Sequence, residues 1–393
     1  MLDTFLWSKD FPLQVCVFNS TSLSDQAHDT HESQLQAATL EYTRVQTLLA
    51  ALTPHIKRCK LLHFELLYPT SLPPAAFFLQ RLPNLKELTL LSGRGIPPPP
   101  FVVGFGNPWT IGNPIQPVAS RPSLCWLNCL AFDAFTFMCL ARAFKGLWSE
   151  ICYRDRHLRL SIWNYTFRPA RRDRSASRFT FEEFIGYLVD AGFGCLSLRN
   201  MHIAGPRDIS AEPSNHPEPY SSSYTGIRFE NVSRELISEC LSICDLRQQE
   251  SFAFRSCDIP PIDDFFGYFL KLENIPRSTD LQGVLKLWQG RQLTIGSSAC
   301  FNDSLLAWFS DNRRCAQYLD SLFLFDCDSF SMEALKEFID ARTEELGEED
   351  GEDLNDFDEE PCIRELRVQG GGHTLADEDR LWFQQRVKRF SFE

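Results

Sequence analysis

The sequence lacks the long apolar runs and the leader segment that membrane insertion or export would require. No run of eighteen apolar residues occurs, and the most apolar stretch, 129–144, contains Asp133 and Arg142. A membrane-spanning helix needs about 20 predominantly apolar residues. The first ten residues have no basic start, no apolar segment and no small-residue cleavage site. We therefore expect a cytoplasmic or nuclear protein with no membrane partner.

The sequence also lacks the cysteine spacing of a zinc site. It contains 14 cysteines, but no two of them form a Cys-x-x-Cys pair. In a protein that is not exported, we expect these thiols to be reduced and mostly buried as small apolar groups. The polar segment with His28 and His31 has no further Cys/His cluster nearby, so we interpret it as a solvated loop. No metal site is predicted.

Sequence motifs of catalysis are missing too. No Gly-x-Ser-x-Gly elbow occurs, so the sequence gives no hydrolase triad. Residues 104–112 superficially resemble a phosphate-binding loop, but prolines flank them and no Lys-Ser/Thr pair ends the segment. We predict a protein that is not an enzyme and that uses no cofactor.

Basic residues are not in excess. The 393 residues include 39 basic and 52 acidic ones, which gives a formal net charge of −13 at pH 7. Eleven of the acids lie between Glu344 and Glu360, and without them the chain would carry only −2. We therefore expect no nucleic-acid partner, and we predict that 344–361 is a disordered acidic insertion.

Two further stretches interrupt the apolar pattern. Residues 93–122 contain four consecutive prolines with scattered Gly and Asn, and residues 205–225 are rich in Pro, Ser and Asn. Such compositions cannot offset the entropy lost on ordering. We predict a Pro/Gly-rich loop and a polar loop at these positions.

One short theme recurs between the interruptions. An apolar residue and two variable residues precede Leu-x-Leu or a variant, and a Cys or Asn often follows, as in Leu319-Asp-Ser-Leu-Phe-Leu-Phe-Asp-Cys327. Each instance predicts a short strand that buries alternate side chains, and the Cys or Asn fits a turn where its side chain satisfies backbone groups. The other instances are 85–90, 158–160, 195–200, 227–231, 252–257, 293–295 and 363–368.

Segments with helical spacing lie between the strands, at 181–189, 236–244 and 331–342. A strand–helix unit repeated every 25 to 45 residues or so is typical of a leucine-rich-repeat solenoid. We predict an irregular α/β solenoid of this class over residues 1–393. Its parallel strands would form a concave face, its helices a convex face, and residues 376–390 a C-terminal cap. The alternative is an ordinary α/β domain with parallel strands.

Several segments resemble the repeat region of a known family. They are Asp10-Phe-Pro-Leu-Gln-Val-Cys-Val-Phe18, His55-Ile-Lys-Arg-Cys-Lys60, Leu82-Pro-Asn-Leu-Lys-Glu-Leu88, Leu319-Asp-Ser-Leu-Phe-Leu-Phe-Asp-Cys327 and Leu375-Ala-Asp-Glu-Asp-Arg380. Through them, nearly the whole chain resembles the leucine-rich-repeat region of the F-box-like proteins of mushroom-forming fungi. In that family the F-box binds a Skp-type adaptor of a cullin–RING ubiquitin ligase, and the repeats capture the substrate. The resemblance implies a protein substrate of unknown identity as partner.

The F-box itself is not visible in the sequence. The first predicted strand begins at about residue 11, which leaves no room for an F-box before it. A Skp-type adaptor is therefore expected as a partner only if an F-box lies upstream. The alternative is a stand-alone repeat scaffold with no connection to ubiquitin.

The residues between the buried strand positions are predicted to face outward on the concave surface. Arginines recur there in successive central repeats, and an aromatic pair follows them. The candidate partner-binding residues are Arg159, Arg199, Arg228, Arg255, Phe323, Phe325 and Arg367. Guanidinium groups suit carboxylates or phosphates, and exposed phenylalanines suit a peptide anchor. The alternative is a solvated strand face with ordinary charge alternation.

Two charged segments lead to further hypotheses. The acidic insertion could fold back over the arginines and compete with a partner, although a solvated loop that aids solubility is the favoured interpretation. The basic cluster of Arg168, Arg171, Arg172, Arg174 and Arg178 is interpreted as an exposed loop between repeats.

Overall fold

The chain divides into two compact units, Met1–Asp208 and Ile209–Glu393, which we call unit 1 and unit 2. A computed structural model describes residues 11–19, 31–68, 71–73, 84–93, 127–143, 158–167, 179–190, 194–204, 225–242, 249–262, 267–312, 315–343 and 363–393. The predicted loops 93–122 and 205–225, apart from Gly93 and Thr225, lie outside these ranges, as do the acidic insertion and the basic cluster.

Unit 1 is a parallel sheet whose strands alternate with helices. The strands are β1 (Leu13–Phe18), β2 (Cys59–Leu66), β3 (Glu87–Ser92), β4 (Cys129–Asp133), β5 (Arg159–Phe167) and β6 (Cys195–Ile203). The helices are α2 (His31–Leu52), the 3-10 helix η2 (Thr53–Arg58), α4 (Ala134–Ala143) and α6 (Phe181–Asp190). Each strand pairs in parallel with the next one in the chain.

Unit 2 repeats this arrangement. Its strands are β7 (Gly226–Val232), β8 (Ser251–Arg255), β9 (Phe269–Glu273), β10 (Gln292–Gly296), β11 (Ser321–Phe325), β12 (Glu365–Gln369) and β13 (Arg389–Phe392). The helices are α7 (Arg234–Ser242), α8 (Leu281–Lys286), α9 (Asp303–Asp311), α10 (Met332–Thr343) and α11 (Asp377–Arg386). These strands also pair in parallel and in chain order.

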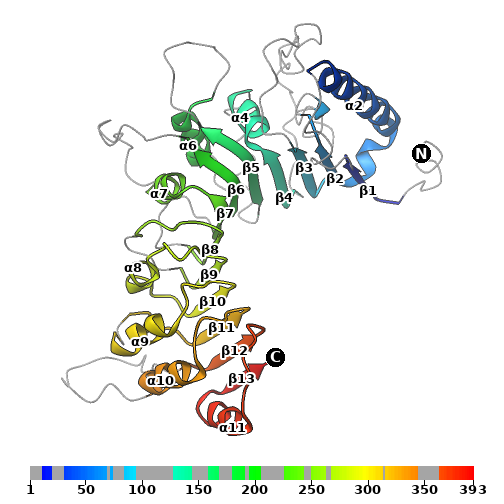
Figure 1. The fold of residues 1–393 in the computed structure, drawn as a ribbon. Helices are drawn as coiled ribbons and strands as arrows, with labels where there is room; N and C mark the ends of the chain where they lie inside the picture. The colour runs from blue at the N-terminus through cyan, green and yellow to red at the C-terminus, as the bar shows by residue number, and fades with distance from the viewer. Residues whose placement is uncertain are drawn as a thin grey trace, which may run out of the picture. The chain divides into compact units, whose positions relative to one another are not determined.

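Within each unit the helices lie on one side of the strands (Figure 1). Strands that are neighbours in the sheet are also neighbours in the chain. This order is that of a solenoid, in which each repeat stacks on the one before it. The predicted fold class is therefore confirmed as an α/β solenoid-like, leucine-rich-repeat-like arrangement. We call the side of the sheet away from the helices the open face.

Alternate strand residues build the core beneath the sheet. In β11, Leu322 and Leu324 are buried, whereas Phe323 between them is only half-buried. Several phenylalanines occupy the inward positions that leucine holds elsewhere, among them Phe64, Phe132, Phe229 and Phe254, all with at most 1% exposure. The period of two residues therefore decides which side chains reach the open face.

A residue of left-handed conformation follows the outward-facing positions of β5 to β11 and explains the recurring Asn. The residue after the last outward-facing strand position has a positive φ between 47° and 58° at Asn164, Asn200, Asn231, Ser256, Asn274, Ser297 and Asp326. Asn and Asp tolerate this left-handed conformation best among residues with a side chain. At six of these seven positions the next residue is buried, and at one of them the Cys257 thiol accepts a bond from the Val232 N–H (3.5 Å) and donates one to the Arg255 carbonyl (3.1 Å). The predicted role of satisfying backbone groups is thus confirmed for this Cys, whereas Asn and Asp supply the left-handed residue before it.

The predicted helices correspond to α6, α7 and α10, and local side chains define where they begin. Thr180 and Glu183 form a reciprocal capping box at α6, because the Thr180 hydroxyl accepts from the Glu183 N–H (3.1 Å) and the Glu183 carboxylate accepts from the Thr180 N–H (2.9 Å). The Ser331 hydroxyl similarly accepts from the Ala334 N–H at the start of α10.

Other elements were not predicted, and α2 is the longest of them. It begins at His31, so the predicted solvated loop is wrong at this residue, while His28 lies outside the described ranges. Threonines spaced four apart donate to backbone carbonyls within the helix, and Leu35 and Leu40 are exposed, which obscures the apolar period. The predicted cap at 376–390 contains α11, but the chain continues into β13, which pairs with β12.

A buried carboxylate fixes α2 to the end of β2. Glu41 accepts hydrogen bonds from the Leu67 N–H (2.9 Å), the Tyr68 N–H (3.1 Å) and the Asn19 side-chain amide (2.6 Å). Glu41 is 9% exposed. It therefore satisfies two backbone groups that follow the strand, in the role that a Cys or Ser plays in unit 2.

Candidate binding surface

The strand register decides which outward-facing side chains are neighbours. Paired residues on adjacent parallel strands lie about 4.8 Å apart. Along the middle of the open face of unit 2, the pairing brings together Arg228, Ala253, Lys271, Thr294, Phe323, Arg367 and Ser391 in this order. All seven predicted binding residues lie on strands, at positions that alternate with buried ones.

The predicted arginines do not form one continuous ladder. Arg159 pairs with Cys195 at the start of β5 and β6, whereas Arg199 pairs with Trp163 near their middle. In unit 2, Arg228 pairs with Ala253, and Arg255 pairs with Glu230. The arginines differ in position because they stand before, between or after the two buried apolar residues of their strands. The arginines therefore do not form a single file of cations within either unit.

The cations of β7 to β9 are balanced by carboxylates. Glu230 lies 3.4 Å from the Arg228 guanidinium and 3.7 Å from that of Arg255. On β9 the Lys271 ammonium lies 2.7 Å from the Glu273 carboxylate. Each exposed ion pair contributes only about 0.2–1 kcal/mol to stability, but together they reduce the positive potential here. The strands β7 to β9 therefore show ordinary charge alternation on a strand face, which was the alternative to a binding surface in the sequence analysis.

An aromatic surface follows on β11 and β12. Phe323 and Phe325 are half-buried on the open face, and the Arg367 guanidinium lies 4.8 Å from the centre of the Phe323 ring. The Arg367 Nε–H donates to the Glu365 carboxylate at 2.9 Å, which holds the guanidinium over the ring. Arg367 thus stacks on the Phe323 ring and is at the same time paired with the Glu365 carboxylate.

A second stacked pair lies on β5 and β6 of unit 1. The Arg199 guanidinium is 4.7 Å from the centre of the Trp163 ring. Arg159, four residues before Trp163, is exposed, and Ser161 pairs with Ser197 between them. Arginine and tryptophan are the side chains that contribute most often to protein interfaces.

Three residues of the open face were missed by sequence reasoning. Trp163 follows the predicted strand 158–160, and extending its alternation by three residues would have found it. Phe269, which is 40% exposed, and Lys271 lie on β9. That strand carries Leu270-Lys-Leu272 and then Asn274, so the signal was present in the sequence.

Asp133 is the most strongly perturbed carboxyl group near this surface. It ends β4 and begins α4, where its carboxylate accepts from the Thr136 N–H and from the Thr136 hydroxyl, both at 2.9 Å. Complete burial raises the pKa of Asp133 to about 6, and the hydrogen bonds from Thr136 limit this rise. The contacts are those of a helix cap, so we assign Asp133 a structural role.

Burial also raises the pKa of several cysteine thiols. It raises the pKa of the Cys59 and Cys300 thiols to about 11 and that of Cys139 to about 12. A thiol of this kind stays protonated at neutral pH, and the thiolate is the nucleophilic form. These cysteines act as small buried groups rather than as nucleophiles.

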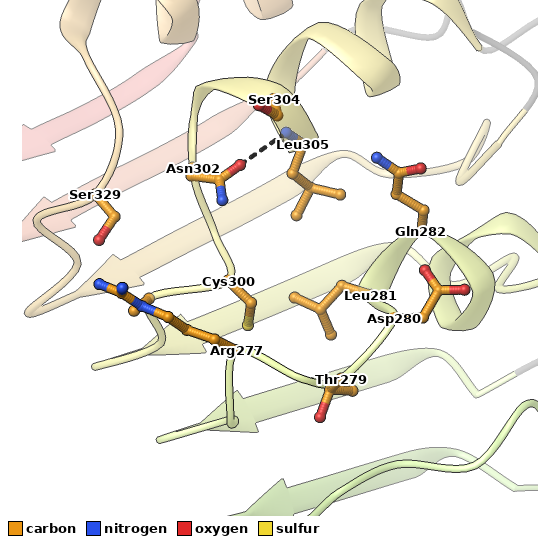
Figure 2. Close-up of a pocket in the computed structure, with 11 residues that line it drawn as sticks. Arg277, Thr279, Asp280, Leu281, Gln282, Cys300, Asn302, Ser304, Leu305 and Ser329 are labelled. Atoms are coloured by element: carbon orange, nitrogen blue, oxygen red, sulfur yellow. Dashed lines mark hydrogen bonds between the residues drawn. The ribbon is translucent and has the colours of Figure 1, made fainter.

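A cavity of about 520 Å³ lies in unit 2, where the loops after β9 and β10 meet the first turns of α8 and α9. Figure 2 shows the Arg277 side chain reaching toward Ser329 across this space. The Asn302 side chain accepts from the Leu305 N–H at 3.1 Å, and Asp280 caps α8 in the same way. Two of the polar groups that line the cavity thus stabilise helix starts, and we do not place the binding surface there.

Within the described ranges, no three His, Cys, Asp or Glu side chains cluster closely enough to hold a metal ion. In the same part of the chain, no helix is long and apolar enough to cross a membrane.

No protein-family model, no curated protein and no solved structure matches the chain. The fold and the side chains of the open face are therefore the features that point to a function.

Proposed function

We propose that this chain is a non-enzymatic binding module that holds a segment of a partner protein on its open face. One observation carries the proposal: each unit places a cation stacked on an aromatic ring at outward strand positions, Arg199 on Trp163 and Arg367 on Phe323. Such side chains offer a large contact area together with directional hydrogen bonding, and they dominate protein interfaces. Helices lie on the other side of the strands (Figure 1).

The resemblance to F-box-like proteins supports a more specific proposal. We infer that the bound partner is a substrate to be presented to a ubiquitin ligase, through a Skp-type adaptor if the native product carries an F-box. We place the protein in the cytosol or the nucleus, since the ten described cysteines are free thiols and a reducing compartment keeps thiols in this state. A stand-alone scaffold differs from this proposal only in lacking the adaptor.

A peptide-display selection on the whole chain tests the binding role. Peptides recovered with the native protein are measured again on Trp163→Ala and on the double variant Phe323→Ala/Phe325→Ala. The control is Tyr318→Ala, because Tyr318 is 53% exposed and precedes β11 rather than lying on it. We expect at least a tenfold loss of affinity with one of the open-face variants and less than a twofold change with the control. Peptides that bind all three variants equally would show that binding occurs elsewhere.

The ubiquitin connection is tested separately. The native product, expressed from its own gene with any upstream sequence, is purified under mild conditions and probed for a Skp-type adaptor. Recovery of the adaptor in equimolar amount supports the ligase role. Its absence, together with peptide binding on the open face, supports the stand-alone scaffold.

A further inference from the structure

The cations of the open face are not equivalent, and the difference lies in their counter-charges. Arg228 and Arg255 share the Glu230 carboxylate, and Arg367 is bonded to Glu365. Arg159 on β5 is exposed, and within the described part of the chain its guanidinium has no ion pair and no hydrogen bond. A guanidinium without a counter-charge attracts an anionic ligand more strongly than one already bound to a carboxylate.

The strand register relates Arg159 to Arg199. Arg159 pairs with Cys195, and Arg199 stands four residues further along β6. At about 3.3 Å per residue and 4.8 Å between strands, their Cα atoms lie about 14 Å apart. Ser161 and Ser197, which pair with each other, lie between them and add hydroxyl groups. An extended peptide spans this distance with carboxylates at positions i and i+4.

Two polar atoms beside Arg199 are unsatisfied. Among the residues that the structure describes, the buried Trp163 indole N–H and the buried Ser197 hydroxyl have no hydrogen-bond partner. A buried polar group without a partner destabilises the free protein, so a ligand that supplies an acceptor gains affinity from satisfying it. A carboxylate that draws Arg199 away from the Trp163 ring would bring acceptor oxygens to both groups.

We propose that β5 and β6 form the part of the open face that selects the partner, and that they bind an extended acidic segment of a protein. Carboxylates of this segment bind Arg159 and Arg199, and its backbone lies over Ser161 and Ser197. A nucleic acid is disfavoured as the ligand, because two cations are few for a polyanion. This inference rests on the proposed function and specifies the chemistry of the partner.

The test uses the whole chain and a labelled 12-residue peptide with Glu at positions 4 and 8 in a Gly/Ser/Val background. The matched peptide carries Gln at both positions, and a 12-nucleotide oligouridylate is measured as well. We expect the Glu peptide to bind at least tenfold more tightly than the Gln peptide and to lose affinity as the salt concentration rises from 50 to 300 mM. The double variant Arg159→Gln/Arg199→Gln removes this preference.

The matched control is Arg228→Gln/Arg255→Gln, which removes the same charge from arginines that Glu230 already balances. It is expected to change the affinity for the Glu peptide less than twofold. Equal binding of the Glu and Gln peptides, an equal effect of both double variants, or tighter binding of the oligouridylate overturns the inference. If the Glu preference fails while display-selected peptides still need Trp163 or Phe323, the proposed function stands and only the acidic chemistry is wrong.

Discussion

At the scale of single residues, the neighbour in register decides what an outward-facing side chain can do. Arg159 and Arg255 are both exposed on strands, yet Arg255 has the Glu230 carboxylate 3.7 Å away. Sequence periodicity correctly predicted that both would face outward. It could not show which carboxylate lies on the adjacent strand, since that depends on the lengths of the intervening loops.

The buried carboxyl group of Asp133 makes the stability of unit 1 depend on pH. Because its folded-state pKa is raised to about 6 from an ordinary value of 3.8, the folded protein binds this proton more tightly than the unfolded chain does. The contribution of Asp133 to stability is therefore greatest below pH 4 and falls as the pH rises to about 6, by about 3 kcal/mol at most.

The substitution Asp133→Asn should remove this dependence, because the Asn side chain still accepts from the Thr136 N–H but carries no charge. Thermal unfolding followed by circular dichroism from pH 4 to pH 7 is the measurement. The variant should match the native protein at pH 4 and unfold at a higher temperature at pH 7. A difference between the two proteins that stays constant with pH would contradict the assignment.

At the scale of secondary-structure elements, a buried hydrogen-bonding residue in the turn after the strand recurs along unit 2. In unit 2 the buried turn position is Cys257 after β8, Ser298 after β10 and Cys327 after β11. The Ser298 hydroxyl donates to the Gly296 carbonyl (2.8 Å) and accepts from the Ile275 N–H (3.1 Å), which is the pattern of Cys257 in its own turn. Thiol and hydroxyl are therefore interchangeable here.

This equivalence predicts opposite results for two substitutions of Ser298. The variant Ser298→Ala leaves the buried Ile275 N–H without an acceptor and should lower the free energy of unfolding by about 1–3 kcal/mol. The variant Ser298→Cys should cost less than about 1 kcal/mol, since cysteine occupies the same position in two other turns. Urea denaturation gives both values, and an equal loss for the two variants would refute the proposed hydrogen-bonding role.

The turn after β12 requires glycine for two reasons, a positive φ and a close contact with backbone atoms. Gly371 and Gly372 both have positive φ, 75° and 69°, so alanine is strained at either position. A Cβ on Gly371 would also lie 2.2 Å from the Cys327 carbonyl oxygen, whereas one on Gly372 would meet nothing within 4 Å. The backbone cannot easily move away, because the same carbonyl bonds to the His373 ring.

We expect Gly372→Ala to cost about 1–2 kcal/mol through backbone strain alone. Gly371→Ala should cost clearly more, because it adds a contact with backbone atoms. The difference between the two denaturation midpoints isolates that contact. If both variants unfold at the same denaturant concentration, the turn is more adaptable than its geometry indicates.

At the scale of the whole molecule, each strand and helix packs mainly on its neighbours in the chain. A repeat protein of this kind loses stability locally when one repeat is damaged. Glu41 offers a test, because its carboxylate satisfies the Leu67 and Tyr68 N–H groups at the end of β2 in unit 1. The substitution Glu41→Ala leaves both groups without this acceptor.

Hydrogen exchange should show the effect in one unit only. In Glu41→Ala we expect amides of β1 to β3 to exchange about 30-fold faster, which corresponds to about 2 kcal/mol. Amides of β9 to β12 in unit 2 should keep their native rates. Glu41→Gln retains one acceptor oxygen and should show a smaller change. Faster exchange throughout both units would mean that the chain unfolds as one cooperative body.

The fold class and most of the strands are predictable from the amino-acid sequence alone. Alternation of buried residues with period two and the left-handed residue of β5 to β11 are local properties, so the Leu-x-Leu segments and the following Asn or Cys predicted them. Helices α6, α7 and α10 were predicted for the same reason, because each has a clear apolar face. The strand β4 was not predicted from the sequence. Asp133 is its last residue and also caps α4, so no turn motif follows the strand.

How the candidate residues are grouped depends on the tertiary structure. Arg159 and Arg199 lie at different levels of β5 and β6, and Arg228 and Arg255 lie at different levels of β7 and β8, since a side chain's level depends on its place relative to the two buried residues of its strand. The ion pair between Arg255 and Glu230 and the stacking of Arg199 on Trp163 arise between residues that are far apart in the chain. Register fixes such contacts, and register depends on how whole repeats stack.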